Sequence, residues 1–172
     1  MKRRLKILDK IIRAVKGSST FAIGGHMRPD GDCIGSQLAM AFALKNLGKK
    51  VTVFNQDEMP EKLAFLDPRK IITGPRKTRH YDCVLVTDCA SYERMGTICD
   101  SVSRRDLLIN IDHHGSNSRY GDINWVDPKS ASSGELVFRL FKQANWPITP
   151  PIADCLFTAI STDTGSFQYA TT

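Results

Sequence analysis

Two continuous apolar runs constrain the fold of this 172-residue chain more than any other feature. Residues 83–86 read CVLV and residues 107–111 read LLINI, and polar residues follow each run at once. A strand that is apolar on both sides must be covered on both sides, which is typical of parallel sheets in α/β proteins. We therefore expect both runs to be buried strands of a parallel sheet.

The rest of the chain alternates between strand and helix patterns. Further strands are expected at 20–25, 50–55 and 123–126, with Ile71 and Ile72 in a brief strand that we do not count. Helices are expected from the N-terminus to Lys16 and at 34–47, 61–66, 133–144 and 151–161. This alternation predicts an α/β fold in one domain, with a doubly wound, mostly parallel five-stranded sheet and helices on both faces.

Charge and cysteine content narrow the function classes. The net charge of +6 suits an anionic partner such as a nucleotide or nucleic acid. No apolar run is long enough to span a membrane, and the basic N-terminus is amphipathic and unlike a signal peptide. The five cysteines lack zinc-like spacing, so we expect free thiols in a reducing cytoplasm. Cys33 is either reactive or a tolerated small residue, and we favour the latter.

Polar residues gather where the predicted strands end. Residues 24–36 read GGHMRPDGDCIGS, between the first strand and the first long helix. Ligands bind at the carboxyl edge of the strands in open α/β sheets. Candidate site residues at this edge are His26, Asp30, Asp32, Asp88, Asp112, His113 and His114, and Asp163 after the last helix can reach it.

The negative charge of so many neighbouring carboxylates must be neutralised, for example by bound cations. Two unit charges about 4 Å apart repel by roughly 4 kcal/mol at an effective dielectric near 20, and a domain is stable by only about 5–15 kcal/mol. Carboxylate and imidazole ligands without thiolate suit Mn²⁺, with Mg²⁺, Co²⁺ or Fe²⁺ as substitutes. Two divalent ions bridged by one carboxylate are used for phosphoester hydrolysis, in which they acidify water and hold phosphoryl oxygens.

Each residue also has an ordinary structural interpretation. The sequence DGD at 30–32 is good turn chemistry, Asp88 and Asp163 could begin helices, and His26 could be a buried structural histidine. The combination of four such segments in this order favours a site over four separate coincidences.

Four segments resemble the successive motifs of the DHH phosphoesterase family. They are HMRPDGDCIGS, VTDCAS, NIDHHGSN and AISTDTGSFQY. Their amino-acid sequences are most similar to those of the nanoRNase and pAp-phosphatase branch, which hydrolyses very short oligonucleotides and 3′-phosphoadenosine 5′-phosphate (pAp). The resemblance implies two Mn²⁺ ions and short oligonucleotides or nucleotides as substrates.

The resemblance also implies a role for each candidate residue. His26 and Asp30 would hold one metal ion, and Asp32, His113 and Asp163 the other. Asp88 would bridge both ions. His114 would face the scissile phosphate, as substrate ligand or proton donor, and Asp112 would orient a histidine through its ring N–H. The spacing alone does not assign His113 and His114 to different roles.

Several expectations remain open at this stage. The family has a second, smaller domain after the fourth motif, so we expect residues 1–172 to be the catalytic domain without that substrate-binding part. Cyclic dinucleotides, longer single-stranded DNA and pyrophosphate are alternative substrates. A metal- or nucleotide-binding module without catalysis is an alternative of another class. The family resemblance also suggests a homodimer.

Overall fold

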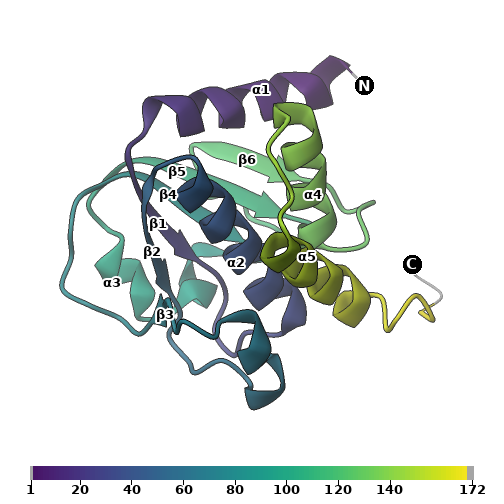
Figure 1. Ribbon diagram of the computed structural model, residues 1–172. Coiled ribbons are helices and arrows are strands. Elements are labelled where there is room, and N and C mark those ends of the chain that lie inside the picture. Colours follow the sequence, from purple (N-terminus) through teal and green to yellow (C-terminus); the bar gives the residue numbers. More distant parts are fainter. Residues whose placement is uncertain (1, 170–172) are drawn as a thin grey trace.

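A six-stranded sheet forms the centre of the computed structural model, which describes residues 2–169 (Figure 1). The strand order is β3-β2-β1-β4-β5-β6, and every pair of neighbours is parallel. The strands are β1 (Thr20–Gly24), β2 (Lys50–Phe54), β3 (Ile72–Thr73), β4 (Tyr81–Thr87), β5 (Arg105–Asp112) and β6 (Ile123–Val126).

The sheet winds outward in both directions from β1. The chain runs from β1 to β2 and β3 on one side, then returns to place β4, β5 and β6 on the other. Gly24 at the end of β1 pairs with Phe54 of β2 and with Val86 of β4. The carboxyl ends of β1 and β4 therefore lie side by side at the point where the winding reverses, which is where open α/β sheets form their ligand crevice.

The two faces of the sheet are covered unequally. The larger core contains side chains of α1 (Lys2–Gly17), α2 (Gly31–Asn46), α4 (Ser133–Ala144) and α5 (Pro150–Asp163). On the opposite face, a smaller core includes the 3₁₀ helix η2 (Tyr92–Met95) and the single-turn helix α3 (Ile98–Ser101). Alternate residues of β1 divide between the cores, with Phe21 and Ile23 in one and Ala22 in the other.

Helix α5 is held unusually close to its neighbours. A Cβ atom added at Gly35 of α2 would lie 2.4 Å from the carbonyl oxygen of Cys155. A Cβ added at Gly134 of α4 would lie 2.5 Å from the Cβ of Ala159. Both glycines therefore let backbone and small side chains meet across the helix contacts, and this fixes the position of α5, which ends at Asp163.

The predicted elements are confirmed in kind, with corrections at their boundaries. The expected five-stranded sheet has six strands, because β3 contributes only two residues and carries little sequence signal. The helix expected from Ile34 begins at Gly31, since the carboxylate of Asp30 accepts the backbone N–H groups of Asp32 and Cys33. The last helix continues to Asp163 instead of ending at Ser161. Helix α3 and η2 were not predicted, and η1 (Glu61–Leu66) is a 3₁₀ helix.

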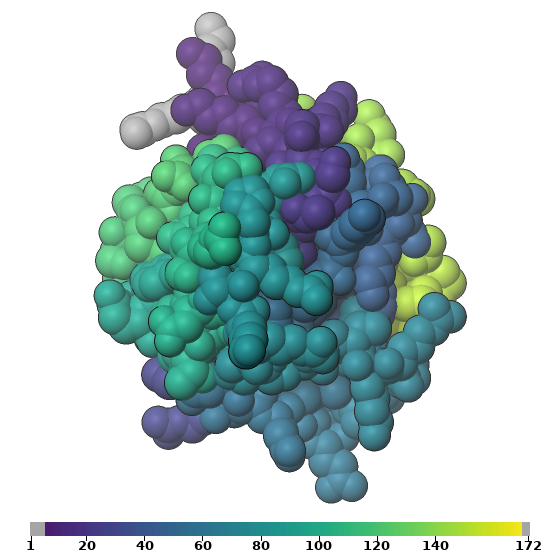
Figure 2. Space-filling view, turned by 90° about the vertical axis from the view of Figure 1, so that its left-hand side faces the viewer, coloured from purple at the N-terminus to yellow at the C-terminus, as the bar shows by residue number. Residues whose placement is uncertain are grey.

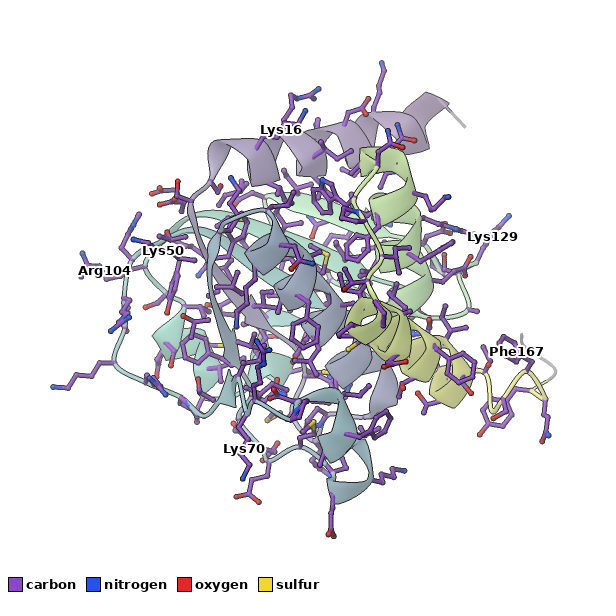
Figure 3. All side chains as sticks on the ribbon, in the orientation of Figure 1. Lys16, Lys50, Lys70, Arg104, Lys129 and Phe167 are labelled. Atoms are coloured by element: carbon purple, nitrogen blue, oxygen red, sulfur yellow. The ribbon has the colours of Figure 1, made fainter. Side chains whose placement is uncertain are left out.

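The surface carries its positive charge in separate places. Figure 3 shows Lys16, Lys50, Lys70, Arg104 and Lys129 on different parts of the molecule. The side that faces the viewer in Figure 2 is formed largely by the middle of the chain, coloured teal. Between residues 2 and 169, no helix combines the length and apolar character needed to cross a membrane.

Candidate metal centre

Residues from four separate segments meet at the carboxyl edge of the sheet, where the winding reverses. His26 follows β1, Asp88 follows β4, and Asp112 is the last residue of β5. Asp30 and Asp32 lie at the start of α2, and Asp163 reaches the same place from the end of α5. The structure thus brings together every candidate residue of the sequence analysis, namely His26, Asp30, Asp32, Asp88, Asp112, His113, His114 and Asp163.

Asp88 lies at the middle of this cluster. Its carboxylate Oδ2 is 3.3 Å from His26 Nε2, and its Oδ1 is 3.7 Å from His113 Nε2. The side chain is only 2 % exposed, and its backbone has a left-handed φ of 54°. Few residue types other than glycine, asparagine and aspartate tolerate that conformation. The strained turn directs one carboxylate between two histidines, with one oxygen facing each.

The first group of ligand atoms surrounds His26. Its Nδ1 lies 2.8 Å from the carbonyl oxygen of Met27, so it carries the proton there and leaves Nε2 free to face the carboxylates. Nε2 is 3.8 Å from Asp30 Oδ1. Ligand atoms of His26, Cys33 and Asp88 all lie within 4.8 Å of one another.

Electrostatics in this first group follow from burial and pairing. Burial disfavours the charged imidazole of His26, but Asp30 and Asp88 raise its pKa above the ordinary value. Burial also acts to raise the pKa of Asp30, but His26 and backbone N–H groups lower it to about 2. Burial raises the pKa of the Cys33 thiol to about 11. Without a bound cation, the first group therefore holds its protons on the imidazole and the thiol.

The second group consists of Asp32, His113 and Asp163. His113 Nε2 is 3.3 Å from Asp163 Oδ2 and 3.8 Å from Asp32 Oδ2. All three offer ligand atoms within 4.8 Å of one another. Burial raises the pKa of Asp163, His113 lowers it and Asp88 raises it, so that the net shift is upward. This group could therefore offer a metal ion carboxylate oxygen and imidazole nitrogen.

The start of α4 cradles the carboxylate of Asp32. The backbone N–H of Ser133 donates to Oδ2 at 2.7 Å and that of Gly134 donates to Oδ1 at 2.8 Å. The N-terminus of a helix favours negative charge at such a position. Burial and the nearby charge of Asp88 nevertheless raise the pKa of Asp32. The carboxylate is therefore held in place by the protein but is short of positive charge.

Asp112 has a different environment from Asp88. It accepts hydrogen bonds from His113 N at 2.9 Å, His114 Nδ1 at 2.8 Å and Asn117 Nδ2 at 2.6 Å. Burial acts to raise the pKa of Asp112, but His114 and Asn117 lower it. The bond to Asp112 in turn raises the pKa of His114, against burial. Because His114 uses Nδ1 for this bond and is 36 % exposed, its Nε2 remains available.

Three residues of the site were not predicted to take part. Ser133 and Gly134 were expected only as the start of a helix, and Asn117 only as part of a motif. In addition to its N–H bond, Ser133 donates its hydroxyl to Asp88 Oδ1 at 3.2 Å. The small residues at 132–134, where an amphipathic helix begins, are the signal that could have indicated an anion-holding helix start.

The donor set fits a bound divalent cation. Asp32 and Asp88 are 1 % and 2 % exposed, and within the described part of the chain no lysine or arginine forms an ion pair with either. Buried charges are normally paired or coordinate a metal. Carboxylate and imidazole ligands that converge within a few ångströms provide such coordination. The residues present therefore suit metal ions better than an empty, mutually repelling cluster.

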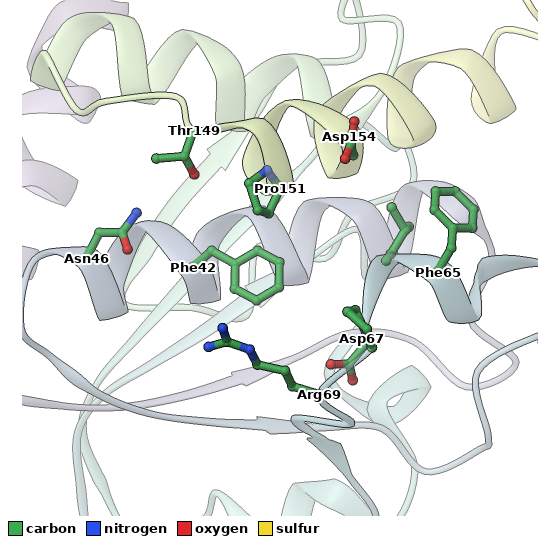
Figure 4. Close-up of a pocket in the computed structure, with 10 residues that line it drawn as sticks. Phe42, Asn46, Phe65, Asp67, Arg69, Thr149, Pro151 and Asp154 are labelled. Atoms are coloured by element: carbon green, nitrogen blue, oxygen red, sulfur yellow. The ribbon is translucent and has the colours of Figure 1, made fainter.

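A separate cavity lies away from this cluster (Figure 4). It has a volume of about 400 Å³ and lies between the second half of α2, η1 and the start of α5. Phe42, Phe65, Arg69, Pro151 and Asp154 are among its lining residues. None of the candidate metal-centre residues lines this cavity, so the cavity and the candidate metal centre are separate places.

Comparison with known proteins agrees with the motifs. The family model described as "DHH family, N-terminal domain" matches residues 20–160. The chain belongs to the DHH family. The bifunctional oligoribonuclease and PAP phosphatase NrnA of Thermus thermophilus is 34% identical to this DHH-family chain over 170 residues. That alignment covers 98% of this chain and 50% of the relative.

Two further proteins are similar to this DHH-family chain. A solved exopolyphosphatase-related protein from Bacteroides fragilis has a TM-score of 0.87 and 27% identity, covering 95% of this chain and 52% of that one. A protein of Enterococcus faecalis named a probable manganese-dependent inorganic pyrophosphatase is 24% identical over 168 residues, covering 89% of this chain and 51% of the relative. The chain spans about half the length of the curated relatives it matches.

Proposed function

We propose that this chain is the catalytic domain of a Mn²⁺-dependent phosphoesterase that hydrolyses short oligonucleotides, pAp, or both. The observation that carries the proposal is the position of Asp88, whose two oxygens face the histidines of two different ligand groups. One carboxylate shared between two groups is the arrangement expected for a pair of bridged metal ions.

The proposed ligands divide into two sets around this shared carboxylate. His26 and Asp30 hold one ion, and Asp32, His113 and Asp163 hold the other. Two Mn²⁺ ions, when bound, supply an acidified water and positive charge for the phosphoryl oxygens. The name of the Enterococcus faecalis relative supports manganese, and Mg²⁺ or Co²⁺ could substitute.

The remaining residues position and protonate the substrate. Asp112 holds Nδ1 of His114, which fixes the imidazole and directs Nε2 away from the buried carboxylate. Nε2 of His114 is thereby available to bind a phosphoryl oxygen and to donate a proton to the leaving oxygen. The main chain of α4 holds Asp32 in place, so this member of the second ligand set is positioned by the protein itself.

The substrate class rests on the similarity to NrnA and on charge. The Thermus thermophilus relative is named an oligoribonuclease and PAP phosphatase. Both named substrates are polyanions, which suit a chain with a net charge of +6. We further propose that a second domain, outside residues 1–172, completes substrate recognition. The homodimer suggested by the family resemblance stays a prediction.

The test is Mn²⁺-dependent hydrolysis by the 172-residue chain of three compounds: a 5′-phosphorylated dinucleotide, pAp and pyrophosphate. We expect turnover of the first or second and loss of at least about a thousandfold in kcat/KM in Asp88→Asn. Asparagine tolerates the left-handed backbone at position 88, so this variant should remain folded.

The outcomes separate the alternatives. Near-normal hydrolysis by the Asp88→Asn variant would refute the proposed centre. Turnover of pyrophosphate alone would move the chain to a different substrate class. Tight Mn²⁺ binding without any hydrolysis would identify a metal-binding module that requires a further domain for turnover.

A further inference from the structure

Cys33 is the one sulfur-containing side chain among the described ligand groups at the carboxyl edge of the sheet. We propose that Cys33 supplies a thiolate ligand to the ion held by His26 and Asp88, and that this gives the first subsite a preference for softer ions than Mn²⁺. The proposal rests on the metal centre of the proposed function and names a ligand beyond that set.

The position of the sulfur is that of a ligand atom. Ligand atoms of Cys33, His26 and Asp88 all lie within 4.8 Å of one another, and the three side chains are buried. Cys33 is 0 % exposed, so solvent does not compete for its sulfur. Its backbone N–H donates to Asp30 Oδ1 at 3.0 Å, which ties Cys33 to another proposed ligand of the same ion.

The surroundings hold the sulfur in this position. A Cβ atom added at Gly25 would lie 2.4 Å from the Cys33 Sγ, so the sulfur lies directly against the backbone that follows β1. From the other side, Gln37 places its Nε2 3.5 Å from the sulfur and 2.9 Å from Asn55 Oδ1.

The polarity of these contacts suits a thiolate. Gln37 presents its N–H donor to the sulfur, which accepts in this arrangement. A negatively charged thiolate accepts a hydrogen bond more strongly than a neutral thiol. When the ion binds, the S–H bond breaks, a metal–sulfur bond forms and the proton passes to water.

The two subsites therefore differ in chemical character. The second group offers carboxylate oxygen and imidazole nitrogen from Asp32, His113 and Asp163. The first adds sulfur to such ligands, and thiolate ligands favour Zn²⁺, Co²⁺ and Fe²⁺ over Mn²⁺ or Mg²⁺. One softer ion in the first subsite and one Mn²⁺ in the second is the expected occupancy when both kinds of ion are supplied.

The experiment is a titration of the 172-residue chain with Co²⁺, followed by absorption spectroscopy. We expect a thiolate-to-cobalt charge-transfer band in the near ultraviolet that saturates with the first equivalent. The band should disappear in Cys33→Ala and persist in Cys99→Ala, which removes a thiol outside the ligand groups. Zn²⁺ affinity should fall at least about tenfold in Cys33→Ala, and Mn²⁺ affinity by less than about threefold.

Each outcome decides the proposal. Co²⁺ binding that needs Asp88 but gives no thiolate band would overturn the cysteine ligand and leave the metal centre standing. A chain that binds no Co²⁺, Zn²⁺ or Mn²⁺ would overturn both. Should Cys33→Ala fail to fold, the spectrum of the unaltered chain decides, since the band requires a sulfur ligand.

Discussion

Asp88 and Asp112 lie at the ends of adjacent strands, and both are buried, yet their surroundings are opposite. Asp112 accepts three N–H hydrogen bonds from the segment that follows it. Asp88 accepts one hydroxyl from Ser133 and otherwise faces imidazole nitrogens. The protein therefore supplies several donors to the carboxylate of Asp112 and leaves that of Asp88 short of them. Between these two buried carboxylates at strand ends, the hydrogen-bond donors around each one make the difference.

The largest expected effect that tests this comparison is stabilisation by metal. Mn²⁺ at a hundredfold excess over its Kd should raise the free energy of unfolding by about 2.7 kcal/mol. For a chain of this length, this is a rise in Tm of about 5–10 °C. Thermal unfolding with and without chelator measures it. Asp88→Asn should show almost no shift, and an equal shift in that variant would contradict the assignment of Asp88 as the shared ligand.

The next effect concerns the metal-free protein. Asp112→Asn places an N–H where Asp112 now accepts donors, so we expect a loss of about 1–3 kcal/mol in the free energy of unfolding. Asp88→Asn removes both the repulsion with Asp32 and the attraction to His26, so its metal-free stability should change less than that of Asp112→Asn. Chemical denaturation in the presence of chelator measures both. Equal losses of stability in the two variants would contradict the difference between Asp88 and Asp112.

Asp112→Asn should also affect turnover differently from Asp88→Asn. Because Asp112 acts through His114, its loss should lower kcat by about 10–100-fold while Mn²⁺ affinity changes less. Comparing kcat with Mn²⁺ affinity in the two variants separates orientation of a side chain from coordination of an ion.

The smallest effect comes from a carboxylate at the opposite edge of the sheet. Asp82 Oδ2 accepts the N–H groups of Ser19 at 2.7 Å and Thr20 at 3.0 Å. These backbone N–H groups, a hydrogen bond with the Thr20 side chain and the nearby His80 lower the pKa of Asp82, while desolvation acts weakly to raise it. The stabilisation is thus present above the pKa of an unfolded aspartate, about 4, and is lost as the pH falls through the lower folded value.

The direction of this pKa shift is tested by measuring the free energy of unfolding of Asp82→Asn at several pH values in the acid range. The variant should be slightly less stable than the unaltered chain at neutral pH, and the difference should shrink at low pH. Metal affinity should not change. Asp106→Asn is a suitable control, because that carboxylate is 68% exposed and pairs with a half-exposed histidine, His80. A difference that grew as the pH fell would contradict the lowered pKa.

The sequence indicated much of the fold because its strands carry clear periodicity. The strand at 123–126 and the helix at 133–144 have the predicted bounds, since β-branched residues mark the first and a serine cap with an amphipathic pattern marks the second. Two-residue β3 and the short helices η2 and α3 carry too few residues for a period to be visible. They form through tertiary contacts, such as burial of Met95 and Ile98 against the sheet.

The site was predictable in its members but less so in its detailed contacts. Asp88 and Asp112 each lie at the end of a predicted strand. Because parallel strands share a direction, both were expected at the carboxyl edge of the sheet. The family resemblance implied different roles for Asp88 and Asp112, but strand position alone did not distinguish them. Asn117 and Ser133 reach these carboxylates only in the folded chain. It also favoured Cys33 as a merely tolerated residue, because its distance to His26 depends on how the strand end meets the helix.

The close packing of α5 joins two parts of the molecule. One end of this helix borders the 400 Å³ cavity through Pro151 and Asp154, and the other end carries Asp163. Gly35 and Gly134 allow neighbouring helices to pack closely against α5 between these two places. A single well-packed helix therefore contributes both to the wall of the cavity and to the candidate metal centre.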